Sequence, residues 1–105
     1  MSTSAPTRDQ TIRRLLAAEA EIRQLGVRRL ALFGSMSRGE ARPDSDVDLL
    51  VEFAPGQKSF DRFMALSDLL ENLVGRPVEL VTIEALSPFI GPHILAEAAD
   101  VLRAA

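Results

Sequence analysis

Residues 32–39 read LFGSMSRG, residues 40–44 read EARPD and residues 45–53 read SDVDLLVEF, and the rest of the chain is organised around these three segments. Two apolar runs of β type flank a Gly-Ser turn and a polar loop. Successive side chains of a strand point to opposite faces, so Asp46 and Asp48 are expected on the same face of the second run. Two neighbouring carboxylates repel each other unless a cation lies between them. The pair therefore predicts a cation site where this run begins.

A hard divalent ion suits such a pair. Mg²⁺ prefers oxygen ligands and is usually bound by one or two carboxylates together with substrate phosphates. The Gly34-Ser35 turn would supply the phosphate half of the site, since Gly34 lets the backbone approach a ligand closely. A helix beginning near Ser35 would also direct free N–H groups and its positive dipole end at a phosphate. Together these residues predict a nucleotide-binding site.

Two arginines stand between the turn and the aspartates. Arg38 and Arg42 would lie near a bound triphosphate, and an arginine can bind a phosphate through two parallel hydrogen bonds. The alternative is that both are solvated charges of an exposed loop, where ion pairs contribute little. The sequence leaves both interpretations open.

The two halves of this pattern resemble a known family signature. Gly34-Ser35, Arg38-Gly39 and Ser45-Asp46-Val47-Asp48-Leu49 match the G-S-x-x-x-G … S-D-x-D-L signature of the polymerase-β-like nucleotidyltransferases. The short chain is similar to their minimal nucleotidyltransferase (MNT) branch, and the resemblance covers nearly all of it. Each half alone is a weak signal, because Asp-x-Asp pairs and Gly-Ser dipeptides also occur in ordinary turns. The two halves in order, with apolar strands on both sides, are a strong one.

The resemblance implies an α/β (α+β) fold, namely a small mixed β-sheet flanked by helices. Residues 1–105 are expected to form a single domain, with residues 1–6 disordered. The first elements expected in chain order are a helix capped by Thr7 and Gln10 and ended by Gly26, a strand at 27–33 and a helical turn at 36–39. A strand at 47–53 should follow, then a helix from Ser59 to Val74 that is ended by Gly75 and Pro77, and a strand at 78–82. A helical turn and loop at 83–89 should lead to a last helix from Pro92, which carries Ile94, Leu95, Ala98, Val101 and Leu102.

Composition excludes some classes of function. The 105 residues carry a net charge of −3, which does not predict a nucleic-acid binder. There is no cysteine, so disulfides and thiolate metal sites are excluded. No uninterrupted apolar run is long enough for a membrane span or a signal peptide, and a cytoplasmic protein is expected.

A third carboxylate stands in the predicted strand at 78–82. Glu79 is the only charge in this short apolar run, and a buried charge is costly unless it is paired. In the family this strand carries a carboxylate beside the first two, usually Asp, and Glu79 matches its position with one additional methylene. The alternative is an edge-strand glutamate facing water. The resemblance implies Asp46, Asp48 and Glu79 as catalytic residues and metal ligands, with two Mg²⁺ ions about 3.5–4 Å apart and ATP as substrate.

The implied reaction is in-line attack of a hydroxyl on the α-phosphorus, with magnesium pyrophosphate leaving and Ser35 and the backbone around Gly34 holding the β- and γ-phosphates. The chain has no room for an acceptor-binding domain, so a separate protein is expected as acceptor or to complete the cleft. The resemblance implies transfer of AMP to a tyrosine or other hydroxyl of a HEPN toxin, with this chain as its antitoxin. Two alternatives are a catalytically inactive module that neutralises a partner by direct association, and a subunit that modifies a small molecule such as an aminoglycoside together with another chain.

Overall fold

The computed structural model describes residues 7–40, 42 and 45–103, and the expected disorder of residues 1–6 lies outside them. The described elements, in chain order, are α1 (Arg8–Ala17), α2 (Glu19–Gln24), β1 (Val27–Phe33), α3 (Gly34–Ser37), β2 (Val47–Phe53), α4 (Phe60–Val74), β3 (Val78–Thr82), the 3₁₀ turn η1 (Ile83–Ala85), α5 (Gly91–Glu97) and β4 (Ala99–Leu102).

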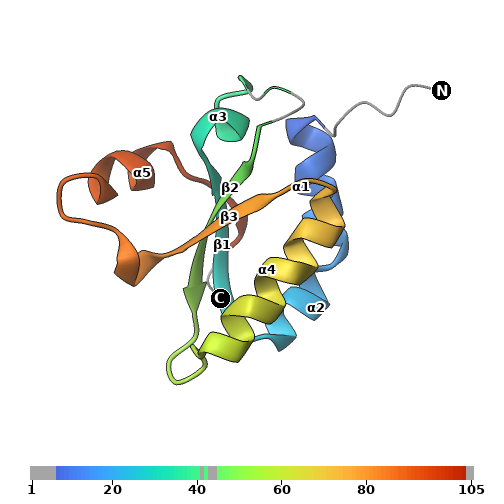
Figure 1. The fold of residues 1–105 in the computed structure, drawn as a ribbon, viewed down its shortest axis with the longest axis vertical. Helices are drawn as coiled ribbons and strands as arrows, with labels where there is room; N and C mark the ends of the chain where they lie inside the picture. The colour runs from blue at the N-terminus through green and yellow to red at the C-terminus, as the bar shows by residue number, and fades with distance from the viewer. Residues whose placement is uncertain (1–6, 41, 43–44, 104–105) are drawn as a thin grey trace.

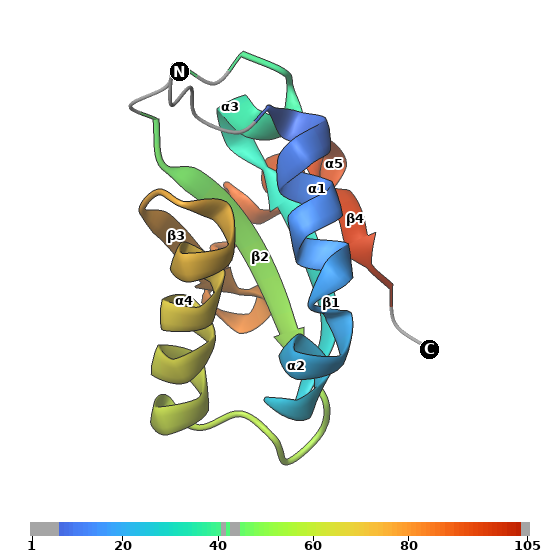
Figure 2. The ribbon, with the colours of Figure 1, turned by 90° about the vertical axis from the view of Figure 1, so that its right-hand side faces the viewer.

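The strands form one mixed sheet in the order β3-β2-β1-β4. β1 runs antiparallel to both β2 and β4, whereas β2 and β3 are parallel. Helices α1, α2 and α4 cover one face, and α5 lies on the other (Figure 1). Figure 2 shows the covered face from the front, with the three helices across it. The predicted mixed sheet flanked by helices is therefore confirmed.

The two faces of the sheet carry apolar clusters of different size. The larger cluster lies under α1, α2 and α4 and includes Leu15, Leu49 and Leu66, all fully buried. The smaller one, on the α5 face, contains three buried residues, Ala31, Phe33 and Leu50. The partly buried residues packed against it come from β3 and the segment that follows, and are Val81, Ile83, Leu86, Ile94 and Ala98.

The predicted helix boundaries are largely confirmed. Thr7 and Gln10 form a capping box at the start of α1, and Ser59 caps α4 by accepting a hydrogen bond from the Arg62 N–H. Gly75 ends α4 in the left-handed conformation, at φ +74°. Two details differ from the prediction: the first helix breaks at Ala18 into α1 and α2, and the short turn α3 begins at position 34 rather than 36.

The prediction for the C-terminus is wrong. The last helix ends at Glu97, and Ala99–Leu102 form β4, antiparallel to β1. Val101 and Leu102 are buried, as expected, but they enter the core from a strand. Residues 94, 98, 101 and 102 fit helical spacing equally well, and four residues are too few for a strand period to be recognised. The backbone groups on the otherwise unpaired edge of the buried β1 need partners, and β4 supplies them.

Among the residues that the structure describes, no helix has the length and apolar character that crossing a membrane requires.

Candidate active site

The three predicted carboxylates lie at one end of the sheet. Asp46 directly precedes β2, and Asp48 is its second residue. Asp48 pairs with Phe33 of β1 on one side and with Glu79 of β3 on the other. Because side chains alternate along a strand, all three carboxylates belong to the face that carries Phe33 and Leu50, which is the α5 face. Asp48 is half-buried, whereas Asp46 and Glu79 are exposed.

Electrostatic coupling joins these carboxylates. Burial, then the charge and hydrogen bond of Glu79 and the charge of Asp46, together raise the pKa of Asp48 to about 6. The charge of Arg38 acts in the opposite direction. Glu79 thus lies on an edge strand and faces water, as the alternative interpretation held, and still interacts with Asp48. A bound cation would favour the ionised carboxylates and thus relieve this mutual repulsion.

The carboxylate oxygens of this cluster suit Mg²⁺, provided that other ligands complete its coordination. No group of three or more His, Cys, Asp or Glu side chains in the described part of the chain is arranged to hold a metal ion by itself. Mg²⁺ is usually held by only one or two carboxylates, and substrate phosphates and water complete its coordination. Asp46 and Asp48 are oxygen donors of that kind, and Glu79 stands next to Asp48 in the sheet register.

Gly34 touches the carboxylate cluster directly. A Cβ at this position would lie 2.2 Å from Oδ2 of Asp48, and the residue adopts φ +72°, so no other residue fits here without strain. The turn that it opens is closed by the Glu40 N–H, which donates to the Ser35 carbonyl at 2.8 Å. Met36 anchors α3 by its buried side chain. The Gly-Ser turn therefore lies directly against the carboxylate of Asp48.

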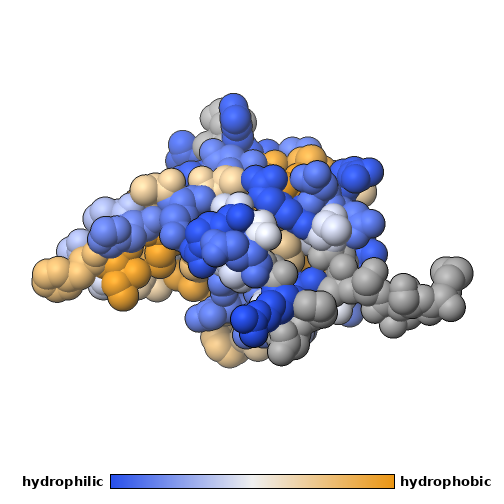
Figure 3. Space-filling view, turned by 90° about the horizontal axis from the view of Figure 1, so that it is seen from above, coloured by the Kyte–Doolittle hydropathy of each residue, from blue (hydrophilic) through white to orange (hydrophobic). Residues whose placement is uncertain are grey.

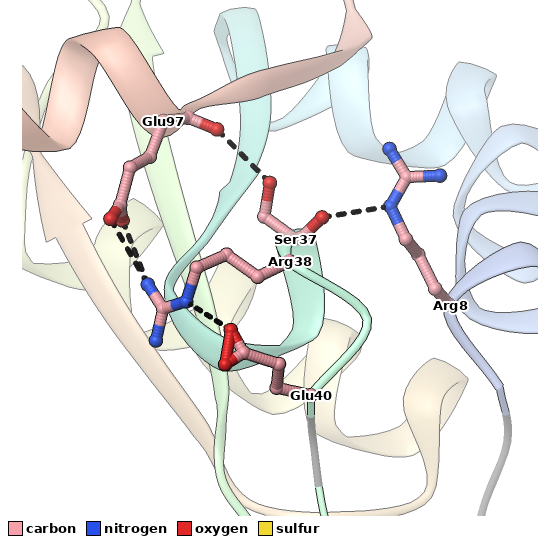
Figure 4. A network of polar contacts seen from close by, with 5 residues as sticks. All are labelled: Arg8, Ser37, Arg38, Glu40 and Glu97. Carbon is pink, nitrogen blue, oxygen red and sulfur yellow. Dashed lines mark hydrogen bonds and ion pairs between the residues drawn. The ribbon is translucent and has the colours of Figure 1, made fainter.

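Arg38 is held beside the site by two glutamates (Figure 4). Its Nε donates to Oε1 of Glu40 at 2.9 Å, and its Nη1 donates to both carboxylate oxygens of Glu97 at 3.0 and 3.1 Å. The hydrogen bond with Glu40 and then the charge of Glu97 raise the pKa of Arg38. No sequence pattern pointed to Glu97, because its place opposite Arg38 depends on where α5 ends.

The same turn connects three helices. The hydroxyl of Ser37 donates to the Glu97 carbonyl at 3.0 Å, and Nε of Arg8 donates to the Ser37 carbonyl at 3.2 Å. Figure 4 shows these bonds running from α1 through α3 to the end of α5. The turn is thereby fixed both to the helix-covered side and to the α5 side of the sheet.

The contacts described for Arg42 are made by its main chain, whereas its side chain is exposed. Its N–H donates to Oγ of Ser45, and its carbonyl accepts from the Ser45 N–H, both at 2.9 Å. Nη1 of Arg76 donates to the carbonyls of Arg42 and Ser45, at 3.0 and 3.1 Å. Sequence reasoning missed Arg76, which lies outside the family signature.

Three large apolar side chains are exposed on α5 and on the two residues that precede it. Phe89 is 85% exposed, Ile90 59% and Leu95 43%. Figure 3 shows hydrophobic surface on this side of the molecule, next to hydrophilic surface nearer its middle. Exposed apolar groups that lie together in this way are typical of surfaces that bind other proteins.

Known proteins are similar to this chain in fold and in sequence. The family described as "Nucleotidyltransferase domain" matches residues 12–101. The protein adenylyltransferase MntA of Thermococcus cleftensis is 43% identical over 84 residues, which are 79% of this chain and 84% of that protein. A solved structure described as a candidate minimal nucleotidyltransferase has a TM-score of 0.80 at 35% identity and covers 90% of this chain and 95% of that one.

A more distant structure contains a partner. It is described as a tri-AMPylated Shewanella oneidensis HEPN toxin in complex with MNT antitoxin, and it has a TM-score of 0.62 at 17% identity, covering 88% of this chain and 72% of that one. At this identity the likeness concerns the fold alone. The family match, in contrast, runs through the Gly-Ser turn and all three carboxylates, and the relatives are alike over most of their length. The chain therefore belongs to the polymerase-β-like nucleotidyltransferases, in their minimal branch, as the two-part motif predicted.

Proposed function

We propose that the chain is a Mg²⁺-dependent protein adenylyltransferase that transfers AMP from ATP to a hydroxyl of a HEPN toxin and acts as its antitoxin. In this proposal residues 1–105 work as one nucleotidyltransferase domain. The observation that carries it is the register that aligns Phe33, Asp48 and Glu79 across three strands, with Gly34 against the Asp48 carboxylate. The closeness of Gly34 to Asp48 supports a site in which the carboxylates bind the metal and the Gly-Ser turn binds the phosphates.

Each carboxylate has a role in the proposal. Asp46 and Asp48 hold Mg²⁺, with Glu79 as a third ligand, and the metal when bound neutralises phosphate charge and polarises the α-phosphate. Glu79 is exposed at the sheet edge, where an acceptor hydroxyl can approach it, and it accepts the proton of that hydroxyl. Transfer then depends mainly on positioning and on charge neutralisation, for which few residues are needed.

The phosphates bind at the Gly34-Ser35 turn, on the side of Asp48 opposite to Glu79. The backbone at Gly34 can approach them closely because no side chain intervenes, and Ser35 donates its hydroxyl. The charge of Arg38 reaches Asp48, since it offsets part of the rise in the pKa of that carboxyl, and it would also attract a polyphosphate bound there. Arg42 contributes an exposed guanidinium from the loop before Ser45.

The acceptor is proposed to be a protein for two reasons. The relative from Thermococcus cleftensis is named a protein adenylyltransferase, and the Shewanella oneidensis structure holds an AMPylated HEPN toxin with an MNT antitoxin. In addition, Phe89 and Ile90, just before α5, and Leu95 on α5 offer apolar surface, and α5 ends at Glu97, the ion-pair partner of Arg38. A protein would bury such side chains, whereas a small acceptor would leave them exposed.

The test is incubation of the chain with a HEPN toxin, ATP and Mg²⁺, followed by intact mass measurement of the toxin. We expect a mass gain of one or more AMP groups, lost toxin activity, and neither change with the Asp46→Asn/Asp48→Asn double variant. That variant should keep the fold, which its melting temperature checks. Neutralisation by the double variant without any mass gain would instead identify the chain as a binding module.

A further inference from the structure

The backbone on both sides of Asp46 is bonded to the segment that leads into β3. Before it, the Ser45 carbonyl accepts from Nη1 of Arg76 at 3.1 Å. After it, the Val47 N–H donates to the Pro77 carbonyl at 2.9 Å. Asp46 is therefore clamped between two consecutive residues of the neighbouring segment, although its own side chain is exposed.

Arg76 makes a bond that the main chain cannot make. In a parallel ladder with Val47 opposite Val78, the Ser45 carbonyl would accept from the N–H of residue 77. That residue is proline and has no N–H to donate. The guanidinium of Arg76 supplies the missing donor and also bonds the Arg42 carbonyl, so that one side chain holds the carbonyls of both residues.

The two bonds on either side of Asp46, from Arg76 and to Pro77, form a clamp that is connected to the site through β3. The residue after Pro77 opens β3, and the next one, Glu79, pairs with Asp48. The side chain of Arg76 is half-buried, so the two bonds are partly protected from competing water. One segment thus fixes Asp46 through its backbone and sets the register of the second and third carboxylates.

We infer that Arg76 is a positioning residue, which holds Asp46 in place for metal binding through the carbonyls of Arg42 and Ser45. The inference rests on the proposed function, in which Asp46 is a metal ligand. Groups that orient metal ligands typically change metal affinity or activity by about 10–100-fold when they are removed. Arg76→Ala should therefore weaken divalent-metal binding although no ligand is altered.

The chain offers a matched control and a rescue. Glu71 also holds the start of β3, since its Oε2 accepts from the Val78 N–H at 3.0 Å, yet no bond described for it reaches the loop before Asp46. Glu71→Ala thus disturbs the same strand without releasing that loop. Arg76→Ala combined with Pro77→Ala restores a backbone N–H opposite the Ser45 carbonyl, and Arg76→Lys retains a cationic donor.

The experiment measures Mn²⁺ affinity by electron paramagnetic resonance in the presence of a non-hydrolysable ATP analogue, and amide hydrogen exchange at Ser45 and Val47. Arg76→Ala should weaken Mn²⁺ binding about 10–100-fold and speed exchange at both amides. Glu71→Ala should keep wild-type affinity and speed exchange at Val78 only. Arg76→Lys and the Arg76→Ala/Pro77→Ala variant should each recover part of the affinity, which a purely destabilising change would not allow.

Three results would overturn the inference. Wild-type Mn²⁺ affinity in Arg76→Ala with faster exchange would show that the clamp does not act on the metal, while the proposed function stands. An equal loss in Glu71→Ala would reduce the role of Arg76 to general support of β3. If the wild-type chain does not bind Mn²⁺ together with the nucleotide analogue, both the proposed function and this inference are wrong.

Discussion

β2 presents two different surfaces to the two faces of the sheet. On the face covered by α1, α2 and α4, Val47, Leu49 and Val51 are completely buried. On the α5 face, Asp48 is half-buried and Leu50 belongs to a cluster of only three buried residues. Strand alternation alone produces this difference, because neighbouring residues point in opposite directions. One face supplies stability, and the other is left open enough for polar groups to meet a substrate.

The comparison explains how a small protein can tolerate a group of like charges. Burial of the Asp48 carboxylate and its repulsion with Glu79 and Asp46 disfavour the folded state, as the raised pKa of Asp48 indicates. The larger apolar cluster on the opposite face offsets that penalty. Variants on the two faces should therefore separate into those that lose stability and those that lose function.

Leu49→Ala should have the largest effect on stability. Leu49 is completely buried in the larger cluster, and truncation of such a leucine costs about 2–5 kcal/mol. Leu50→Ala, one residue along on the α5 face, should cost less, because the smaller cluster there can collapse more readily around the cavity. Urea denaturation of both variants measures the difference. A larger loss for Leu50→Ala would contradict the division of roles between the two faces.

Glu79→Gln should show the reverse pattern. Loss of the charge should lower the rate of AMP transfer by about a hundredfold or more, whereas the free energy of unfolding should hardly change because the side chain is exposed. Transfer to the HEPN toxin is followed by intact mass, and stability by urea denaturation. Glu84→Gln is the control, since Glu84 is also exposed, follows β3 and pairs with Lys58 at 3.5 Å. If Glu79→Gln transfers AMP at the wild-type rate, Glu79 is a solvated residue of the edge strand without a role in transfer.

The sequence predicted the parts of the molecule that are local. Strands at 27–33, 47–53 and 78–82 and the caps at Thr7 and Ser59 follow from periodicity and capping chemistry over neighbouring residues. β4 was missed because its pairing depends on the free edge of β1, far away in the chain. Pro77 was recognised only as the end of a helix, although the N–H that it lacks is what gives Arg76 its contact. Features set by distant segments leave no local period to detect.

Gly34→Ala should have an intermediate effect that joins stability to function. The new Cβ would meet Oδ2 of Asp48 at 2.2 Å, in addition to the roughly 1–2 kcal/mol of strain that a positive φ imposes on alanine. Gly56→Ala is the matched control, because Gly56 has φ +77° and nothing lies within 4 Å of its added Cβ. Both variants should lose stability, but only Gly34→Ala should lose affinity for ATP with Mg²⁺ in a calorimetric titration. Equal ATP affinity in the two variants would separate the Gly-Ser turn from the phosphates.

The smallest effect concerns pH and the Asp48 carboxylate. In EDTA, the folded chain keeps the Asp48 proton up to a pKa of about 6, whereas the unfolded chain releases it near the ordinary value of 3.8. The folded state therefore binds more protons between these values, and this carboxylate lowers the free energy of unfolding as pH rises through the interval. Asp48→Asn removes this effect, so the free energy of unfolding of the variant should match that of the wild type below pH 4 and exceed it above pH 6. We expect a gain of about 1 kcal/mol, since water screens a half-exposed carboxylate.

Asp68→Asn, an exposed change on α4, should show no such pH dependence in urea denaturation at pH 4 and pH 8. A gain from Asp48→Asn that is equal at both pH values would mean that the variant does not act by removing a buried carboxylate charge and its repulsion with Glu79 and Asp46.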